Sequence, residues 1–288
     1  MTDFLKYRIP SFCLSTLFIA AGALAYFQHG GFRYSVDFTG GTQVLLKLSK
    51  EIGSEQLKGA LGDAGWQDPL IREFGKKEVV IRVQEFSHDS QGLAQKMQTT
   101  LEATFTDTKV EILEANAVGP SVGKNLAKNF LLALLLSLLA MLMYIAFRFF
   151  SFSYGLGAVI AIFHDALAIL ALFALTQREI SPNVICAIIA TLGYSINDTI
   201  VIFSRMRENF VKMRGEVAST VVNISIAQTM RRTMLTSLST ALTVGSLLIW
   251  GGETLRNMSL ALLVGIIVGT YSSVFIASPI MLMFRRKD

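Results

Sequence analysis

The 288-residue chain has the composition of a membrane protein rather than of a soluble one. Hydrophobic residues make up 52% of it and charged residues only 16%, which is apolar-rich and charge-poor for a soluble domain. The net charge of +5 would suit a nucleic-acid-binding protein, but the lysines and arginines gather at the ends of apolar runs, as topology determinants do. Nucleic acid is therefore not an expected partner. Cys13 and Cys186 both lie in apolar runs and are expected to be small buried side chains, not parts of a disulfide framework or zinc motif.

Six apolar runs are each long enough to cross a bilayer, which takes about 20 residues per helix. The expected fold class is thus a polytopic α-helical membrane protein with six transmembrane helices. The first span resembles a signal peptide at Ala23-Leu24-Ala25, but its apolar stretch is long for one, and we expect an uncleaved anchor. After it comes an extramembrane domain, and residues 126–288 form a five-helix domain. The six expected spans cover residues 9–28, 130–147, 151–176, 180–204, 233–250 and 258–284.

Lysines and arginines are unevenly divided between the two sides of these spans, and this division predicts the orientation. If residues 1–8 are cytoplasmic, the short loops on the opposite side carry only Arg178 and Arg256. We therefore expect both termini in the cytoplasm and residues 30–125 on the outer face. The basic residues on the cytoplasmic side are then Lys6, Arg8, Arg148, Arg205, Arg207, Lys212, Arg214, Arg231, Arg232, Arg285, Arg286 and Lys287.

The polar segment 30–125 is long enough to bury a small core of its own. Apolar alternation predicts a strand at 42–48, and two short strands are expected at 70–74 and 78–84, joined by a turn at Gly75-Lys76-Lys77. Ser54 is expected to N-cap a helix that runs to about residue 64, and Asp89 or Ser90 opens a second helix that runs to about residue 105. A last strand covers 109–115. The order βαββαβ predicts a small α+β domain with the ferredoxin-like split motif.

No catalytic constellation is expected in this outer domain. His88 stands beside Asp89 without a second histidine, a cysteine or a glycine-rich phosphate loop. Asp37 is followed by Gly40 and Gly41, a pair that is too short for a nucleotide motif and typical of a tight turn. We interpret the domain as a binding or mechanical module rather than an enzyme, without a metal or an organic cofactor.

Few polar residues lie inside the spans, and Asp198 is the most informative of them. A central carboxylate costs roughly 2.5–3.5 kcal/mol on insertion scales, so such residues face a cavity or a partner and tend to be functional. Asp198 lies roughly 10 Å inside the cytoplasmic end of its span, at about 1.5 Å per residue from Arg205, and Arg232 stands at the mouth of the next span. A carboxylate whose cationic partner approaches and withdraws can take up and release a proton. We therefore favour proton or ion handling over a static contact.

The other polar positions have structural interpretations as well. Asn197 and His164 are expected to bridge helices through hydrogen bonds, and Asp165 to form a fixed contact. Adjacent helical residues point about 100° apart, so His164 and Asp165 need not share a face. Residues 265–269 form a GxxxG packing motif, and the moderately amphipathic stretch 210–226 is expected on the membrane surface.

Five segments, in order along essentially the whole chain, resemble the SecF family, whose members are the smaller partners of SecD in bacterial protein export. The family usually has an acidic residue at the position of Ser204, and this is the one visible departure. The matching segments are Ser35-Val36-Asp37-Phe38-Thr39-Gly40-Gly41-Thr42, Val118-Gly119-Pro120-Ser121-Val122-Gly123, Phe163-His164-Asp165, Gly193-Tyr194-Ser195-Ile196-Asn197-Asp198-Thr199-Ile200-Val201-Ile202-Phe203 with Arg205, Arg207 and Glu208, and Gln228-Thr229 with Arg232-Thr233 through Thr236-Ser237.

The resemblance implies a half-assembly of the resistance-nodulation-division type, in which six helices pair with six from SecD in the bacterial inner membrane. Proton flow would drive a cycle of the periplasmic domains that helps a preprotein out of the SecYEG channel. Asp198 and Arg232 match the family's proton-pathway positions, and His164 and Asp165 match motif positions. The implied partners are SecD, SecYEG, the preprotein, membrane lipid, and YajC and YidC as accessory proteins. H⁺ is the expected coupling ion, although a single carboxylate also serves Na⁺.

Two other functions stay open at this point. The first alternative is an exporter of drugs or lipids from the same superfamily. Such exporters commonly carry larger outer domains and both six-helix halves in one chain. The second alternative is a passive scaffold that stabilises the translocon. A passive scaffold would tolerate Asp198→Asn, whereas a proton-coupled subunit would not.

Overall fold

The computed structural model describes residues 3–66, 69–74, 77–83, 87, 89–149 and 151–285. The chain divides into two compact units, one formed by Tyr34–Leu131 and the other by Met1–Arg33 together with Leu132–Asp288. We call these the small unit and the membrane unit. The expected turn at Gly75 and Lys76, the expected strand end at Gln84, His88, and the basic residues Arg286 and Lys287 lie outside the described residues.

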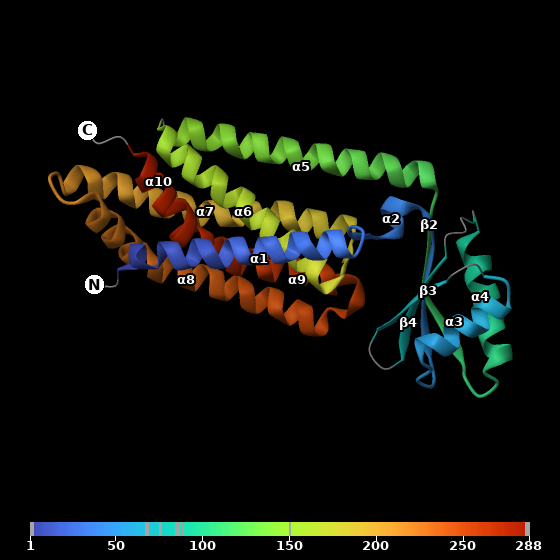
Figure 1. Ribbon diagram of the computed structural model, residues 1–288. Helices are drawn as coiled ribbons and strands as arrows, with labels where there is room; N and C mark the ends of the chain where they lie inside the picture. The colour runs from blue at the N-terminus through green and yellow to red at the C-terminus, as the bar shows by residue number, and fades with distance from the viewer. Residues whose placement is uncertain are drawn as a thin grey trace. The chain divides into compact units, whose positions relative to one another are not determined.

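Six helices among the described residues are long and apolar enough to cross a membrane. The first begins after a short 3₁₀ turn, and the last is continuous but changes its winding partway along. Together they form the elongated bundle in Figure 1. The elements are η1 (Phe4–Tyr7), α1 (Arg8–Gln28), α5 (Pro120–Phe149), α6 (Phe152–Thr176), α7 (Pro182–Lys212), α8 (Ala218–Trp250), α9 (Gly252–Ser272), η2 (Ser273–Ala277) and α10 (Ser278–Phe284), with the two-residue strands β1 (Arg33–Tyr34) and β6 (Glu179–Ile180) outside them.

The helices α7 and α8 extend well beyond the apolar runs from which they were predicted. The amphipathic stretch 210–226, expected on the membrane surface, is instead divided between the end of α7 and the start of α8. The turn between them includes Gly215 in a left-handed conformation, with φ 93°. Val221, Val222 and Ile226 are fully buried, so the apolar side of this segment packs inside the protein rather than on lipid.

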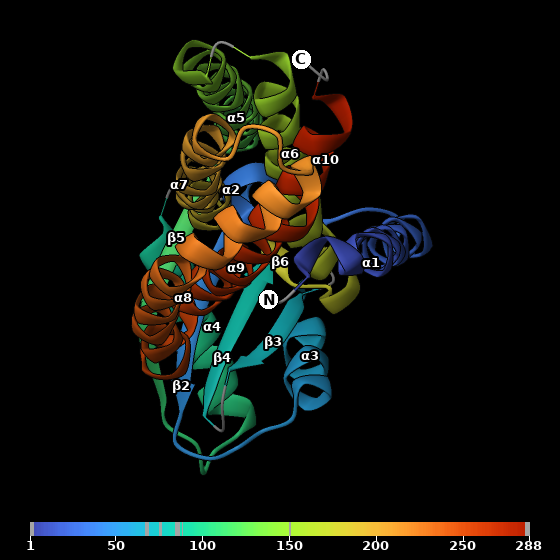
Figure 2. The same cartoon turned by 90° about the vertical axis from the view of Figure 1, so that its left-hand side faces the viewer.

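The helix α9 is the centre of the membrane unit. It packs against α6, α7 and α8, and Figure 2, which looks onto the end of the bundle where both termini lie, shows it enclosed by these three helices. The GxxxG motif makes this possible. A Cβ atom added at Gly265 would lie 2.6 Å from the Cβ of Thr191, and one added at Gly269 would lie 2.6 Å from the Cβ of Ser195. The motif is therefore the seam between α9 and α7, as small residues at a helix crossing predict.

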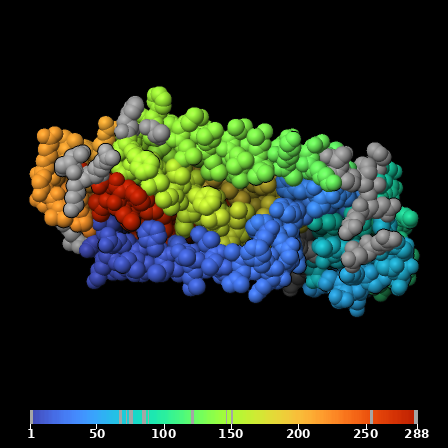
Figure 3. All heavy atoms as spheres, turned by 45° about the horizontal axis from the view of Figure 1, so that its top comes forward, coloured from blue at the N-terminus to red at the C-terminus, as the bar shows by residue number. Residues whose placement is uncertain are grey.

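The outer helices of the bundle leave large apolar side chains uncovered. Leu132, Leu135, Leu139 and Phe147 of α5 are each more than half exposed, and Figure 3 shows α1 and the upper part of α5 flanking α6 and α10. Cys13 and Cys186 are also exposed, so the prediction that both are buried was wrong. A water-soluble protein would not expose so much apolar surface, whereas hydrocarbon chains solvate it. The chain is therefore a multi-pass membrane protein.

The last span contains a turn of π-helix, η2, between α9 and α10. The hydroxyl of Ser278 donates to the carbonyl oxygen of Ser273 at 2.8 Å, which occupies one of the carbonyls that the wider winding frees. Ser272, Ser273 and Ser278 are all fully buried. Such π turns inside helices occur frequently at functional sites, and this one lies against α6 and α7.

The small unit has the element order β2 (Gly41–Leu48), α3 (Ser54–Asp63), β3 (Leu70–Phe74), β4 (Glu78–Val83), α4 (Ser90–Thr104) and β5 (Val110–Val118), after a one-turn helix α2 (Val36–Thr39). The strands form one sheet in the order β3-β4-β2-β5, and all neighbours are antiparallel. The last strand begins one residue later than the expected 109–115 and ends three residues later, because its pairing with β2 continues to Val118 opposite Gly41.

Both helices of the small unit cover the same face of its sheet. Val44, Leu46 and Leu48 alternate along β2 and point into a single apolar cluster that also contains Leu57 and Leu61 of α3. From α4 the cluster receives Leu93, Ala94, Met97 and Leu101. Full burial of such a side chain stabilises a fold by about 1.5–3 kcal/mol, so this core accounts for the integrity of the unit. The expected N-cap of α3 at Ser54 was off by one residue, since Gly53 is the cap and Ser54 begins the helix.

At the start of α4 the structure selects one of two candidate caps. The carboxylate of Asp89 accepts a hydrogen bond from the backbone N–H of Gly92 at 2.8 Å, and Ser90 is the first helical residue. Replacing Asp89 with alanine is expected to cost about 0.5–2 kcal/mol of local stability. Hydrogen exchange at the first turn of α4 measures this loss. Ser90→Ala is the matched control, and equal loss of protection in both variants would contradict the assignment of the cap.

Candidate functional site

The carboxylate of Asp198 lies where three helices meet inside the membrane unit. Asp198 is on α7 and only 4% exposed. Its Oδ2 atom is 3.4 Å from the hydroxyl of Ser237 on α8 and 3.5 Å from the hydroxyl of Thr270 on α9, and these two hydroxyls are 2.7 Å apart. The first two distances are at the long limit for hydrogen bonds. The carboxylate is thus held loosely, by hydroxyl groups.

Arg232, the predicted partner of Asp198, does not belong to the group of side chains that contact the carboxylate. Arg232 is on α8, five residues before Ser237 and therefore about 7.5 Å along the helix axis from it. Its side chain is exposed, and within the described part of the chain it forms no ion pair with Asp198. Its charge acts on Asp198 through space. The structure therefore places the two residues in electrostatic range without joining them.

A buried hydroxyl lies between these two positions on α8. Thr233 is 2% exposed, and its Oγ1 atom has no hydrogen-bond partner among the described residues. Thr233 and Ser237 are four residues apart and so share one face of α8. An unpaired buried hydroxyl costs about 1–3 kcal/mol. This face of α8 thus offers a polar step from the level of Arg232 on the helix toward the carboxylate.

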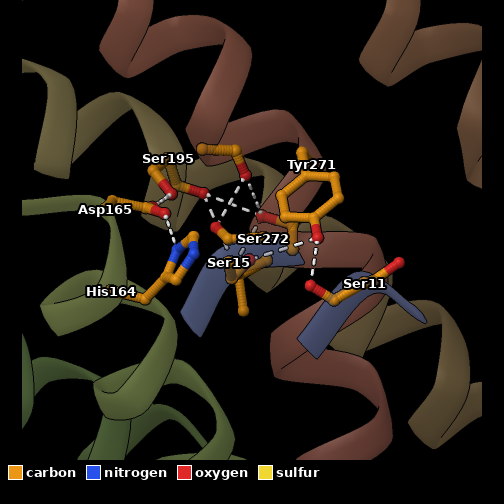
Figure 4. A network of polar contacts seen from close by, with 10 residues as sticks. Ser11, Ser15, His164, Asp165, Ser195, Tyr271 and Ser272 are labelled. Atoms are coloured by element: carbon orange, nitrogen blue, oxygen red, sulfur yellow. Dashed lines mark hydrogen bonds and ion pairs between the residues drawn. The ribbon is translucent and has the colours of Figure 1, made fainter. Parts of the chain in front are cut away.

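A second buried carboxylate, Asp165 on α6, is held much more tightly. Its Oδ1 atom is 3.0 Å from Nδ1 of His164, and its Oδ2 atom accepts a hydrogen bond from the hydroxyl of Ser195 on α7 at 2.5 Å. Figure 4 shows the three side chains converging between the two helices. Asp165 is 1% exposed and His164 9% exposed. Although the two residues are adjacent on a helix, both side chains turn inward and meet, which the spacing alone did not predict.

Hydroxyl groups continue from this second carboxylate to the last span and to α1. The hydroxyl of Ser273 contacts that of Thr199 at 2.8 Å and the carbonyl oxygen of Ser195 at 3.4 Å. The hydroxyl of Tyr271 donates to the carbonyl oxygen of Ser11 at 2.8 Å and lies 3.2 Å from the hydroxyl of Ser15, as Figure 4 shows. These contacts join α1, α7 and the last span through polar groups.

One stripe of α7 supplies both sites. Ser195, Asp198 and Thr199 are spaced i, i+3, i+4 and therefore lie on one face, which is buried. Asn197 points elsewhere. It is exposed and has no side-chain hydrogen bond to any described residue, so the expected bridge between helices is not formed within this chain. Ser195 and Thr199 were not selected as site residues from the sequence, although their spacing from Asp198 places them on the same helix face.

This arrangement can accommodate a change of charge on Asp198. A hydroxyl can donate to a carboxylate and accept from a carboxylic acid, so Ser237 and Thr270 can satisfy either form. No cation contacts the carboxylate among residues 151–285, and an unpaired buried charge is costly. Asp165, by contrast, has both oxygens engaged at short distances. Of the two carboxylates, Asp198 is the one whose surroundings leave room for proton exchange.

In the small unit, Asp37, Gly40 and Gly41 build a turn rather than a reactive centre. The hydroxyl of Ser35 donates to Oδ2 of Asp37 at 2.9 Å. Gly40 and Gly41 have φ values of 79° and 123°, which L side chains rarely adopt. The expected tight turn is therefore present. It leads from α2 directly into β2, one of the two inner strands of the sheet.

This turn packs against another motif far along the chain. A Cβ atom added at Gly123, in the first turns of α5, would lie 2.7 Å from the carbonyl oxygen of Phe38. The ring of Phe38 also meets the ring of Phe130 edge to face, with centroids 5.8 Å apart. Gly123→Ala is therefore expected to destabilise the small unit by about 1–3 kcal/mol, as overpacking does. Limited proteolysis of this unit tests the effect. Gly59→Ala is the control because nothing lies within 4 Å of that position, and equal sensitivity of the two variants would refute the contact.

Two family models match the chain. The model described as protein export membrane protein SecD/SecF, C-terminal, matches residues 96–287, and the SecD/SecF GG motif matches residues 29–52. Among curated relatives, the protein translocase subunit SecF of Rhodothermus marinus is 34% identical, covering 99% of this chain and 93% of that protein. SecF of Pseudomonas aeruginosa is 36% identical, covering 97% of this chain and 90% of that protein.

Solved structures agree with these relatives. The crystal structure of SecDF, a translocon-associated membrane protein from Thermus thermophilus, matches with a TM-score of 0.88 and 33% identity over 98% of this chain. A SecDF structure in a super-membrane-facing form matches with a TM-score of 0.71. In both cases the present chain spans only 38% of the longer SecDF chain.

Proposed function

The chain belongs to the SecF family of protein translocase subunits, and we propose that it couples proton flow to the export of proteins through the Sec translocon. The observation that carries the coupling is the setting of Asp198. This carboxylate is buried in a membrane span, faces two hydroxyls at long distances and has no fixed counter-ion among the described residues. Intramembrane carboxylates in such settings commonly serve proton relays.

Arg232 supplies the switching element in this proposal. With Asp198 ionised, attraction between the two charges draws α7 and α8 together at this level. Protonation of Asp198 removes that attraction and lets the two helices shift. Each proton that crosses a potential of about 100 mV releases roughly 2.3 kcal/mol. That energy biases a two-state movement by about fiftyfold, at 1.4 kcal/mol per tenfold.

The proposed location is the bacterial inner membrane, with both termini in the cytoplasm and the small unit in the periplasm. The distribution of basic residues supports this orientation, since they gather at the ends of spans on one side. We assign the small unit to the ferredoxin-like class because its βαββαβ order and its sheet order β3-β4-β2-β5 agree with the split motif. The residues described in this unit form no group that could hold a metal ion, and we propose a mechanical or binding role for it.

SecD is the proposed first partner, and it would supply the other half of the assembly. The matched SecDF structure is a single longer chain of which this chain spans 38%. The exposed Asn197 and the uncovered leucines of α5 and α8 suit contact with a second membrane subunit as well as with lipid. Further proposed partners are SecYEG, the translocating preprotein, and YajC and YidC as accessory proteins.

Export into vesicles that contain this chain, SecD and the translocon tests the proposal. We expect the late phase of translocation to accelerate when a proton gradient is imposed and to lose that acceleration when a protonophore collapses it. A sodium gradient of equal size is the matched comparison and decides between the two ions. Export that responds to neither gradient, while still depending on the presence of this chain, would leave only the scaffold function.

A further inference from the structure

A large cavity opens at the end of the membrane unit where both chain termini lie (Figure 1). Its volume is about 1440 Å³. It is lined by the connection between α5 and α6, by the turn between α7 and α8, and by the end of α10. The connection between α5 and α6 and the end of α10 coincide with ends of apolar runs, whereas the turn between α7 and α8 lies beyond them. The cavity therefore extends outward from the level where hydrocarbon gives way to water.

The cavity is strongly cationic. Arg207, Arg214 and Arg285 line it, against the single acidic residue Glu216. Arg207 and Arg214 form no ion pair with any described residue, and the guanidinium of Arg285 lies 3.4 Å from the centre of the Phe210 ring. Nearby cations outside the cavity are satisfied differently: Arg205 and Lys212 both bind Glu208, each at 2.6 Å. The three cavity arginines are thus left to bind an anion.

A fixed hydroxyl complements these arginines. The ring of Tyr154 stacks on Phe149, with centroids 5.3 Å apart, and meets Phe203 edge to face at 5.1 Å. Tyr154 is only 8% exposed, yet it lines the cavity, and Arg207 and Arg285 both act electrostatically on its hydroxyl. A hydroxyl donor held by ring packing and two guanidinium groups therefore line the same cavity.

The rim of the cavity is apolar and faces outward. Phe152 is 76% exposed, Met283 79% and Val211 61%, and all three line the cavity. A site for a soluble anion has no need of such a rim. A phospholipid does, since its acyl chains continue from the phosphate into the hydrocarbon layer. The combination of arginines inside and bare apolar side chains at the edge thus favours a lipid over a free anion.

We propose that this cavity binds the phosphate of an anionic phospholipid, with Arg207, Arg214 and Arg285 as its cationic ligands and Tyr154 as a neutral donor. Guanidinium groups bind phosphate in a bidentate manner, and basic pockets between spans on the cytoplasmic side are suited to acidic headgroups. The lipid would join α6, α7 and α10 at their ends. The inference goes beyond proton coupling and does not depend on it.

Native mass spectrometry of the purified complex with SecD tests this site, with phosphatidylglycerol and phosphatidylcholine offered in competition. The wild type is expected to retain phosphatidylglycerol preferentially. Arg207→Gln with Arg214→Gln should reduce that preference about tenfold, since charge-assisted contacts are lost. The matched control is Lys6→Gln with Arg8→Gln, which removes the same charge at the same end of the bundle but outside the cavity, and it should retain the preference.

Tyr154→Phe is the second variant, because it leaves every charge in place. It should weaken phosphatidylglycerol binding about threefold, as loss of one hydrogen bond does. Equal losses in the cavity and control doubles, or no preference in the wild type, would overturn the proposal. Displacement of the lipid by millimolar glycerol 3-phosphate would replace it with a soluble-anion site. Lipid retained by the free chain but lost on addition of SecD would make the cavity a protein interface instead.

Discussion

Replacing Asp198 with asparagine is expected to abolish the acceleration of export by a proton gradient and to leave the protein folded. Asparagine has nearly the same shape, and its amide can still meet the hydroxyls of Ser237 and Thr270, which now lie 3.4 and 3.5 Å from the carboxylate. It cannot change its charge. Removing a buried carboxylate also removes its insertion cost of roughly 2.5–3.5 kcal/mol, so stability should be unchanged or higher. Export with and without the gradient gives the first result, and thermal unfolding in detergent gives the second.

Glu208→Gln is the matched control for this experiment. It makes the same chemical change on the same helix, but at an exposed residue paired with Arg205 and Lys212. Exposed pairs of this kind contribute little to stability, and we expect gradient-driven export to stay within about twofold of the wild type. Normal coupling in the Asp198 variant would remove this residue from the proton pathway. Loss of coupling in both variants would mean that charge on α7, rather than the buried carboxylate, is what matters.

Gly269→Ala is expected to weaken the bundle at the close crossing of α7 and α9. The added methyl group would lie 2.6 Å from the Cβ of Ser195 and 2.9 Å from its hydroxyl oxygen. Overpacking of this kind costs about 1–3 kcal/mol. The push would act on Ser195, the residue that binds Asp165, so the tighter of the two carboxylate sites would be disturbed along with the helix contact. Unfolding in mixed detergent measures the loss.

Gly155→Ala is the comparison for this prediction, since nothing lies within 4 Å of a Cβ at that position. It should be neutral or slightly stabilising, because alanine has the higher helix propensity. A second-site change, Ser195→Gly, removes the atoms with which the new methyl group collides and should restore much of the stability of Gly269→Ala. If Gly269→Ala unfolds like the wild type, the contact between α7 and α9 is looser than the distances at Gly269 indicate.

The predictions that followed from a large energetic cost were the ones that located the buried carboxylates. A carboxylate within an apolar run is expensive, and this alone directed attention to Asp198 and Asp165. Serine and threonine enter membrane spans at little cost and give no such signal. Thr233 and Ser237 were named only as parts of a matching segment, and their positions on the buried face, like that of Thr270, became known only once α8 and α9 were seen beside α7. Asn197 was selected for its polarity, but the direction in which it points is fixed by the packing of neighbouring helices.

Element boundaries likewise depend partly on the local sequence and partly on contacts with other parts of the fold. The apolar runs predicted six spans, and the alternation of Val44, Leu46 and Leu48 predicted the central strand of the small unit. An apolar run stops at the first charged residues, however, so hydropathy did not predict that α8 would start at Ala218. That extension depends on Val221, Val222 and Ile226 finding partners inside the fold. The prediction that Cys13 and Cys186 are buried was wrong because outward-facing positions in a membrane helix are also apolar.

The wide turn at Ser273–Ala277 sets the direction in which the C-terminal end of the last span faces. A helix that takes in one additional residue over a single turn rotates everything beyond it by about 100° relative to an uninterrupted α-helix. Arg285 lies eight residues past Ala277, beyond this offset, and its guanidinium lies 3.4 Å from the centre of the Phe210 ring. The π-helical turn that packs against α7 therefore sets the angular position of Arg285 at the end of the span.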